Sequence, residues 1–248
     1  MKEKQIVRFE YLPDAIYKEA WEYQTKKHKA LIDNKLANRD LEPGTYPQEQ
    51  VLLLVEHLPV FTLGRSGSAA NLLLSEDELR SKGIDYYPIN RGGDITYHGP
   101  GQLVGYPILD LELFKRDVHW FVRQLEEVII RTLLEYGLNG SRIEGYTGVW
   151  ILDNPKFPAT HPDAGKKRKI CAIGVHLSRW VSLHGWAFNI NTELNNFEYI
   201  VPCGIVDPDK SVTSLEQELG RKVDMAEVRT KIIHHFAEVF ECVLQASN

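Results

Sequence analysis

The sequence predicts an α+β fold, in which one mixed β-sheet is flanked by helices and the 248 residues form a single domain. Three observations lead to this prediction. Short apolar segments typical of strands cluster in the middle of the chain, and segments with helical spacing of apolar residues are interspersed among them. No repeat, low-complexity tract or linker divides the sequence. With 43% hydrophobic and 25% charged residues, the chain can bury one sizeable core.

The N-terminal part predicts a strand, a long helix and a second strand. Gln5–Leu12 is typical of a strand, and the polar segment from about Pro13 to Asn38 carries an apolar stripe at helical spacing. We expect Pro13 to open this helix, because proline is tolerated in a first turn. After the loop Leu41–Gln50, the segment Val51–His57 is almost continuously apolar, which predicts a central strand buried on both faces.

Shorter elements follow, separated by glycine loops. Phe61–Gly67 ends in such a loop. Ser75–Gly83 has an acidic first turn and a glycine stop, which predicts a short helix. Ile84–Asn90 and Gln102–Leu111 predict two strands, and a glycine-rich segment joins them.

The second half of the chain predicts one long helix and three strands. Apolar residues at helical spacing predict a helix over Asp117–Tyr136, with Gly137 as its stop. Tyr146–Leu152 is typical of a strand, and the proline-containing segment Asp153–Arg168 predicts a surface loop. Ile170–Asn191 predicts two strands that turn near residues 178–182.

The C-terminal part predicts two helices. Val201–Ser211 is irregular, and helices follow near Ser214–Leu219 and Asp224–Leu244. We expect Ser214 with Gln217, and Asp224 with Glu227, to cap them. These helices, residues of about 214–244, could form a small appendage on the single domain, residues 1–248.

Composition excludes several classes of function. The net charge of −5 argues against a general nucleic-acid-binding protein, which needs a basic face. No apolar run approaches the roughly 20 residues that span a bilayer, and the N-terminus lacks a signal-peptide core, so we expect no membrane association and a cytoplasmic protein. Cys171, Cys203 and Cys242 lack CxxC spacing, and the nine histidines show no ligand spacing. The sequence therefore predicts neither a disulfide framework nor a metal site.

The segment from Arg91 to Leu111, "RGGDITYHGPGQLVGYPILDL", contains four glycines around a Tyr-His pair before it becomes apolar. The glycines have two interpretations: a hairpin that needs their backbone angles, or a loop that lies against a ligand. A phosphate loop is disfavoured, because neither of its glycine motifs is present and a strand follows Gly101 where a helix would be needed. A cradle for an uncharged or extended ligand fits better.

The cysteines differ in their surroundings. Cys171 and Cys242 lie in apolar segments and are typical of buried core residues. Cys203 lies between Pro202 and Gly204, where an accessible thiol can act as a nucleophile. Such a thiol needs a neighbour that lowers its pKa, and a lysine ammonium at ~4 Å contributes about 4 kcal/mol at an effective dielectric of about 20. Spacing alone does not choose among the candidate neighbours, which are His98, His176, His184, Lys166, Lys167 and Lys169.

Four segments in order resemble one family. They are the glycine-rich segment, "KICAIGVHLSRWVSLHG" (Lys169 to Gly185), "WAFNIN" (Trp186 to Asn191) and "VPCGIVD" (Val201 to Asp207). Together the chain resembles the octanoyltransferases of lipoate biosynthesis, also called lipoyl(octanoyl) transferases, which are relatives of the biotin and lipoate protein ligases. The resemblance implies the same ligase-like fold.

The resemblance also implies a reaction. Family members move an octanoyl group from the phosphopantetheine thioester of acyl carrier protein to a specific lysine on a lipoyl domain of a 2-oxoacid dehydrogenase or on glycine-cleavage H protein. No cofactor and no ATP are implied. The family cysteine corresponds to Cys203, which would carry the acyl thioester, and the family lysine corresponds to Lys169, which would lower the pKa of that thiol. An acyl chain would lie along the glycine-rich segment, with His98 near the reacting carbonyl.

The resemblance further implies a set of substrate-binding residues. They are Arg91, Gly92, Gly93, Asp94, Ile95, Thr96, Tyr97 and His98, then Ala172, Ile173 and Gly174, and then Gly185, Trp186 and Ala187.

Further expectations concern the neighbourhood of Lys169. The loop Asp153–Arg168 is long for the family. Cys171 is two residues from Lys169, so both side chains are expected on one strand face and Cys171 could approach the site. Lys166, Lys167 and Arg168 are expected to form a basic approach surface for the acidic carrier protein, the alternative being an ordinary solvated loop.

Two rival functions differ in what they require. An ATP-dependent lipoate or biotin protein ligase on the same fold would form an acyl-adenylate and would not need Cys203. A non-catalytic protein that only binds acyl carrier protein or a lipoyl domain would need neither Lys169 nor Cys203.

Overall fold

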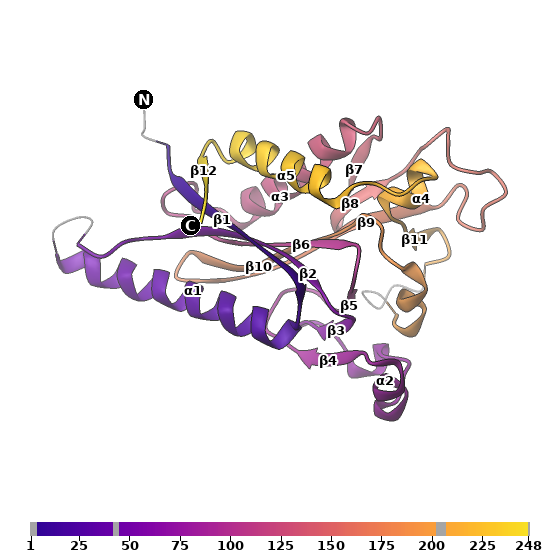
Figure 1. Ribbon diagram of the computed structural model, residues 1–248, viewed down its shortest axis with the longest axis horizontal. Coiled ribbons are helices and arrows are strands. Elements are labelled where there is room, and N and C mark those ends of the chain that lie inside the picture. Colours follow the sequence, from indigo (N-terminus) through magenta and orange to yellow (C-terminus); the bar gives the residue numbers. More distant parts are fainter. Residues whose placement is uncertain (1–3, 42–44, 202–206, 248) are drawn as a thin grey trace.

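A central mixed sheet organises the molecule in the computed structural model, which describes residues 4–41, 45–201 and 207–247 (Figure 1). Its strand order is β12-β1-β2-β6-β10-β9-β8-β7, and β11 adds to β9. The strands are β1 (Ile6–Ala15), β2 (Gln50–His57), β6 (Gln102–Ile108), β7 (Gly140–Ile143), β8 (Tyr146–Ile151), β9 (Lys167–Ser178), β10 (Val181–Asn189), β11 (Lys210–Val212) and β12 (Val243–Ala246). The pairs β1–β2, β1–β12 and β9–β11 are parallel and the others antiparallel, so the predicted mixed sheet is confirmed.

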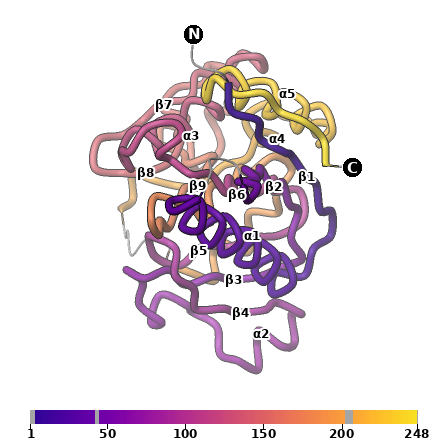
Figure 2. Tube along the Cα trace, turned by 90° about the vertical axis from the view of Figure 1, so that its left-hand side faces the viewer, coloured from indigo at the N-terminus to yellow at the C-terminus, as the bar shows by residue number. Residues whose placement is uncertain are grey.

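Helices cover both faces of this sheet (Figures 1 and 2). The helices α3 (Val118–Leu134) and α5 (Met225–Val239) pack on one face, and α1 (Tyr17–Ala37) packs on the other. Within β2, Leu52 and Leu54 join the first core cluster, whereas Val51 and Leu53 join the second. This alternation confirms that β2 is buried on both faces.

A smaller sheet lies beside the central one and carries part of the glycine-rich segment. It consists of β3 (Val60–Leu63), β4 (Asp85–Pro88) and β5 (Ile95–His98), in the order β4-β3-β5. Phe61 and Ile95 form its core with Leu79 of α2 (Glu76–Lys82). The strand β5 was not predicted from the sequence, which left these residues in a loop.

The expected glycine stop of α2 and the cap at Ser214 are confirmed, whereas Asp224 caps α5 through the Ala226 N–H rather than with Glu227. Ser75 and Glu78 form a reciprocal capping box on α2, and Gly83 ends that helix in the left-handed conformation at φ +66°. Asp117 caps α3 through the Trp120 N–H, and Ser214 caps α4 (Leu215–Leu219) through the Gln217 N–H. Three short 3₁₀ segments complete the described elements: η1 (Asn38–Asp40), η2 (Ala69–Asn71) and η3 (Leu194–Tyr199).

Two predicted helix limits are wrong. Pro13 lies within β1, and α1 begins at Tyr17. The ladder between β1 and β2 shifts register between Leu12 and Ala15, so the missing N–H of proline is tolerated there. The last helix ends at Val239 rather than Leu244, because residues 243–246 form β12 and pair with β1.

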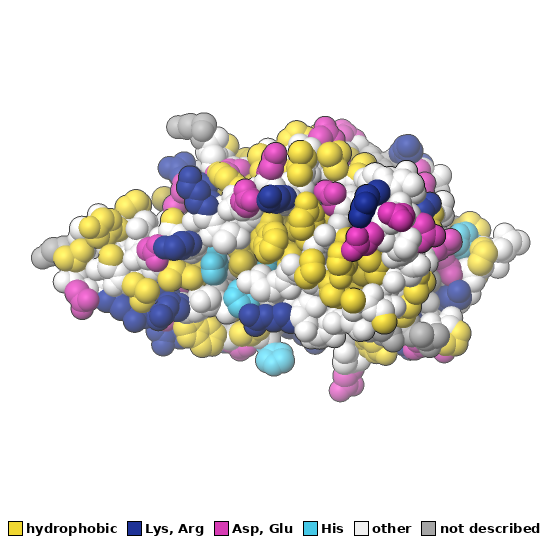
Figure 3. Space-filling view, turned by 90° about the horizontal axis from the view of Figure 1, so that it is seen from below, with side chains coloured by type: hydrophobic (Ala, Val, Ile, Leu, Met, Phe, Trp, Pro, Cys, Tyr) yellow, Lys and Arg dark blue, Asp and Glu magenta, His cyan; other side chains and the backbone are white. Residues whose placement is uncertain are grey.

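The C-terminal segment contacts the main body through several elements. α5 packs against α3 in the core cluster that includes Phe121 and Phe236, and β12 extends the central sheet. Among the described residues, no helix combines the length and the apolar composition that a membrane span requires. The face seen from below has basic, acidic and apolar side chains interspersed, and histidines reach its surface (Figure 3).

A buried ion pair connects α1 to the central sheet. The Lys35 ammonium lies 2.7 Å from Asp110 Oδ1, and the two side chains are 4% and 2% exposed. The same ammonium donates to the Arg179 carbonyl in the turn between β9 and β10, at 2.8 Å. Lys35 therefore connects α1 to the segment just after β6 and to the β9–β10 turn, three segments that are far apart in the sequence.

We predict that Lys35→Ala lowers the free energy of unfolding by about 3–5 kcal/mol, because it leaves the Asp110 carboxylate buried without its cation. Urea denaturation at neutral pH measures this change. Lys29→Ala is the matched control on the same helix, since its exposed pair with Asp33 contributes less than about 1 kcal/mol. Equal effects of the two substitutions would contradict the assigned role of the buried pair.

Candidate active site

A cavity of about 750 Å³ opens where the glycine-rich segment meets β6, β9 and β10. All the substrate-binding residues predicted from the sequence line it except Tyr97: Arg91, Gly92, Gly93, Asp94, Ile95, Thr96, His98, Ala172, Ile173, Gly174, Gly185, Trp186 and Ala187. Tyr97 is buried instead between Phe61 and Phe197, and its hydroxyl accepts a hydrogen bond from Asn196. Three segments that are distant in the sequence thus share one cavity, and their role in binding stays a prediction.

Close packing of the chain on itself explains part of the glycine content. A Cβ on Gly174 would lie 2.6 Å from the Gly92 carbonyl oxygen, and one on Gly64 would lie 2.3 Å from the Gly93 carbonyl oxygen. The Gly92 N–H also donates to the Val175 carbonyl at 3.0 Å. These glycines bring the loop against β9, so the wall of the cavity is backbone there.

Arg91 is held by the small sheet. Its Nη2 donates to the Thr62 carbonyl at 2.6 Å and to the Thr62 hydroxyl at 3.0 Å, and its Nη1 donates to the Gly92 carbonyl at 3.0 Å. The side chain is 8% exposed, so a charged group lies in the wall of the cavity. Its hydrogen bonds to β3 fix where that positive charge is placed.

His98 belongs to a chain of directed hydrogen bonds. Gln102 Nε2 donates to the Tyr97 carbonyl and to Asn189 Oδ1, so its Oε1 is the acceptor for His98 Nδ1 at 2.8 Å. The Thr62 hydroxyl contacts His98 Nε2 at 3.3 Å and is its donor. Burial holds the pKa of His98 well below its usual value, with His57 and Arg91 adding to the effect. The ring is therefore neutral, and both nitrogens are occupied within the protein.

Two more buried histidines border this chain. His57 Nδ1 donates to the Ala15 carbonyl at 3.3 Å, and the Tyr106 hydroxyl donates to His57 Nε2 at 2.7 Å. Burial lowers the pKa of His57 to about 4. His184 donates from Nε2 to Asn90 Oδ1 at 2.8 Å, and burial followed by the Arg91 charge lowers its pKa to about 3. All three histidines are neutral at physiological pH.

Lys169 lies at the junction of two cavities. It lines the 750 Å³ cavity and also a larger neighbouring one of about 1340 Å³, and Phe197 and Val212 line both as well. Its ammonium lies 4.6 Å from the centre of the Trp150 ring. The Lys169 carbonyl accepts a hydrogen bond from the Thr213 N–H at 2.9 Å. A cation is therefore presented where the two cavities meet.

A buried salt bridge fixes the residue before Lys169. Arg168 donates to both carboxylate oxygens of Glu218, at 2.7 and 3.2 Å, and stacks on the Phe157 ring. Glu218 also accepts hydrogen bonds from Thr213 and Asn154. The expectation that Arg168 contributes to a basic approach surface is wrong, because its side chain is only 3% exposed. β9 begins at Lys167, so the predicted loop also ends earlier than expected.

The expectation that Cys171 approaches the site is wrong as well. β8 pairs Trp150 with Lys169 and Val149 with Cys171, so Ile170 is an extra residue that forms a bulge in β9. The bulge breaks the alternation of faces, and Cys171 lies in the core, where burial raises the pKa of its thiol. Cys242 is also buried, with its pKa raised by burial to about 11. Cys203 lies outside the described residues.

Sequence reasoning missed several residues that line the cavity. Tyr17 and Tyr106 come from α1 and β6, and Gln102 and Asn189 connect His98 to the central sheet. Both amides sit in otherwise apolar strands, where a polar residue must find a buried partner. A polar amide within an apolar strand is therefore the sequence feature that could have identified Gln102 and Asn189.

Comparisons with known proteins agree with this geometry. The sequence model of the lipoyl protein ligase A/B catalytic domain matches residues 23–237. An octanoyltransferase of Flavobacterium johnsoniae is 51% identical over 236 residues, which cover 95% of this chain and 97% of that protein. An octanoyltransferase of Christiangramia forsetii is 50% identical over 230 residues, 92% of this chain and 93% of that protein.

Solved structures confirm the fold. A putative lipoate protein ligase from T. acidophilum superposes with a TM-score of 0.64 at 16% identity, over 98% of this chain and 88% of that one. The chain belongs to the lipoyl protein ligase A/B catalytic-domain family. Identity near 50% with octanoyltransferases over nearly the whole of both chains further shows that the protein is an enzyme, an acyltransferase.

We predict that acid destabilises the protein through its buried neutral histidines. The unfolded chain binds a proton at His57 and His184 below about pH 6.5, whereas the folded chain binds them only near the lowered pKa values of about 4 and 3. Their contribution to stability is thus fully present above pH 6.5 and is lost as the pH falls toward 4. At pH 5 each costs about 2 kcal/mol.

Urea unfolding at pH 7.5 and pH 5.0 measures this loss. In His57→Gln the free energy of unfolding should fall less between the two pH values, by the contribution of one histidine. His119→Gln, at an exposed position on α3, should leave the pH dependence unchanged. If the free energy of unfolding stayed constant between the two pH values, the prediction that His57 and His184 remain neutral in the folded protein would be wrong.

Proposed function

We propose that the protein transfers an octanoyl group from octanoyl-acyl carrier protein to a specific lysine of the lipoyl domains of lipoate-dependent enzymes, in lipoate biosynthesis. The reaction passes through an acyl thioester on Cys203. The observation that carries this proposal is the cavity that ends at Lys169, in a chain about 50% identical to octanoyltransferases. We also propose that the enzyme acts in the cytoplasm.

The walls of the cavity suit an acyl chain. Val122, Ile173, Val175 and Ala187 are among the apolar residues that line it. Each methylene that leaves water contributes about 0.8 kcal/mol to binding. Arg91 and Lys169 line the same cavity and would supply positive charge to the thioester carbonyl.

The residues that flank Cys203 support its role as the acyl carrier. The Val201 N–H donates to the Asn71 carbonyl at 2.8 Å, and the Asn71 side chain donates to the Asp94 carboxylate, which lines the cavity. On the other side of Cys203, β11 ends at Val212, which lines the cavity and pairs with Lys169. Both ends of the segment are thus attached to the cavity that contains Lys169.

The chemistry needs no energy-supplying cofactor. Exchange of the octanoyl group between the carrier thiol and Cys203 replaces one thioester with another. Attack by the amine of the acceptor lysine then forms an amide and releases the Cys203 thiol, and the amide is the more stable product. The Lys169 ammonium favours the thiolate of Cys203 in each half of the reaction.

An ATP-dependent lipoate protein ligase is the alternative function. A lipoate-protein ligase A bound with ATP shares the fold, with a TM-score of 0.62, but is only 17% identical over 99% of this chain and 90% of that one. The octanoyltransferases share three times that identity. The transferase function is therefore favoured, and adenylate formation from ATP and octanoate would identify the ligase function.

Lipoyl domains are the proposed acceptors. A structural analysis of an archaeal lipoylation system describes a bi-partite lipoate protein ligase and its E2 lipoyl domain from Thermoplasma acidophilum, and the chain solved there shares this fold. We propose lipoyl domains of 2-oxoacid dehydrogenases and glycine-cleavage H protein as acceptors here. Lys166 and Lys167 remain as candidates for the basic approach surface of the carrier; Lys166 pairs with Asp163 at 2.8 Å.

We predict that incubation with octanoyl-acyl carrier protein adds one octanoyl group to the enzyme, and that hydroxylamine removes it. Intact-mass spectrometry measures the adduct. Cys203→Ala should abolish both the adduct and transfer to a lipoyl domain, whereas Cys171→Ala should retain them, because Cys171 is buried in the core. An adduct that persists in Cys203→Ala but disappears in Cys171→Ala would overturn the choice of nucleophile.

We predict that Lys169→Ala raises the pH at which iodoacetamide alkylates Cys203 by about one unit or more, because the neighbouring positive charge is lost. Acylation at neutral pH should fall with it and recover in part at higher pH. Lys167→Ala is the matched control for the alkylation profile, since Lys167 is an exposed cation two residues away on the same strand and iodoacetamide needs no carrier surface. If Lys169→Ala and the parent enzyme gave the same alkylation profile, Lys169 would have no part in activating the thiol.

A further inference from the structure

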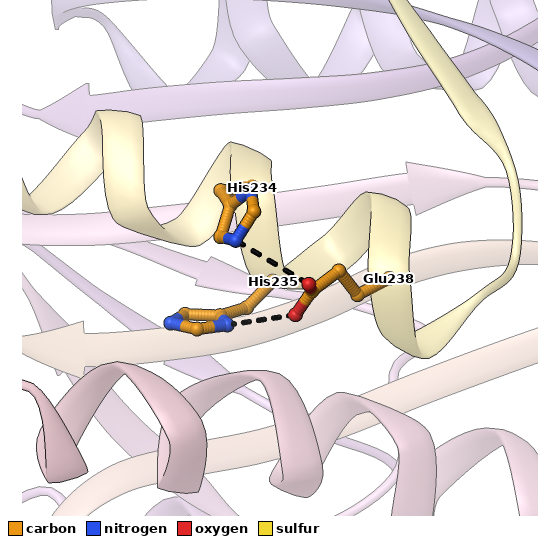
Figure 4. A group of neighbouring side chains, drawn as sticks. All are labelled: His234, His235 and Glu238. Atoms are coloured by element: carbon orange, nitrogen blue, oxygen red, sulfur yellow. Dashed lines mark ion pairs between the residues drawn. The ribbon is translucent and has the colours of Figure 1, made fainter.

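Two histidines and a glutamate gather on α5, away from both cavities. His234 Nε2 lies 3.4 Å from one carboxylate oxygen of Glu238, and His235 Nδ1 lies 3.4 Å from the other (Figure 4). The ligand atoms of the three residues all lie within 4.8 Å of one another. Positions three and four residues apart meet on one helix face, so the helix itself brings both rings to Glu238.

His235 is oriented by a carboxylate from another element. Its Nε2 lies 2.5 Å from Glu135 Oε1, and Glu135 is the residue that caps the C-terminal end of α3. With Nε2 as the donor, Nδ1 of a neutral His235 carries the free lone pair. That nitrogen is buried and has no hydrogen-bond partner among the described residues. Histidines that bind metals commonly donate their other N–H to a carboxylate in this way.

We propose that His234, His235 and Glu238 bind a divalent first-row metal ion of the Zn²⁺ type. Zinc takes imidazole nitrogen and carboxylate oxygen at about 2.0–2.2 Å in tetrahedral geometry, which places neighbouring ligand atoms about 3.4 Å apart. The two separations of 3.4 Å involve different oxygens of Glu238, and all three ligand atoms lie within 4.8 Å of one another, so small side-chain rotations bring one oxygen to this spacing from both nitrogens. Water completes the coordination, because His234 and Glu238 are exposed.

The surrounding charges do not prevent binding. Arg131 Nη1 lies 3.8 Å from Glu238, at the long end of an exposed ion pair. Lys231 pairs with Glu135 and so neutralises the outer carboxylate rather than a metal ligand. An exposed ion pair contributes at most about 1 kcal/mol, so the metal can displace Arg131 from Glu238.

The bound ion would strengthen the contact between α5 and α3. His235 contacts Glu135 beyond the end of α3, while the same ring would hold the ion on α5. The inner surfaces of both helices form the core cluster on that face of the sheet. The sequence predicted no metal site, although the three ligands lie within five residues of one another, because this spacing matches no common metal motif and Glu135, which orients His235, is a hundred residues away.

Isothermal titration with zinc chloride tests the proposal, on the full chain stripped with a chelator. The Cys203→Ser background removes the thiol of the proposed acyl carrier as a competing zinc ligand, and Cys171 and Cys242 are buried. We expect one equivalent of zinc to bind. His234→Ala and Glu238→Gln should each weaken that binding at least tenfold, and Glu135→Gln should weaken it about ten- to a hundredfold by releasing the His235 ring.

The test variants stand at exposed positions, so they retain the fold, and His119→Ala on α3 is the control that should leave zinc binding unchanged. Zinc should also raise the melting temperature of the parent protein but not that of His234→Ala. If no zinc binds, or if His234→Ala and Glu238→Gln bind it as the parent does, the cluster forms ion pairs only and the proposal is wrong. Transfer activity is not measured here, so these outcomes are independent of the proposed octanoyl transfer.

Discussion

The hydrogen bond between His98 and Gln102 connects the two sheets, and the rest of the site depends on it. His98 belongs to β5 of the small sheet, and Gln102 begins β6 of the central sheet. Gln102 Nε2 in turn donates a hydrogen bond to Asn189 Oδ1 of β10, and the Asn189 amide donates to the Thr213 carbonyl at 3.0 Å. One continuous chain of polar contacts therefore runs beneath the cavity from the glycine-rich segment to the residues beside Lys169.

That chain continues into the surroundings of Lys169. Thr213 donates its N–H to the Lys169 carbonyl and its hydroxyl to Glu218, and Glu218 binds Arg168. A buried network of this kind is favourable only when each member has its partners, because an unpaired polar group in the interior costs about 1–3 kcal/mol. The neutral state of His98 follows from the same condition, since each ring nitrogen has one partner of the opposite type.

Two kinds of wall meet in the cavity. On one side, glycines at positions 92, 93 and 174 bring backbone against backbone, and Arg91 is fixed to Thr62 behind them. Apolar residues such as Ile173 and Ala187 line other parts of the cavity. The proposed octanoyl thioester combines an apolar chain with a polar head, and the residues that line this cavity include both kinds together with the Lys169 cation.

Local pattern alone determined much of this protein. The apolar run of β2, the helical spacing of α3 and the glycine stop of α2 depend on neighbours within a few residues, and all were predicted from the sequence. The four family segments likewise indicated an acyltransferase and marked residues that share one cavity.

Tertiary structure decided what depends on distant partners. Residues 243–246 form a strand because β1 pairs with them, Arg168 is buried because Glu218 accepts both of its donors, and Cys171 lies in the core because a bulge opposite β8 reverses its face. The partners of His98 and of His235 likewise come from other elements. The sequence pattern of a segment indicates the spacing of its apolar residues and its backbone preference. The position of a buried polar group, or of an extra residue in a strand, depends instead on the surface that it packs against.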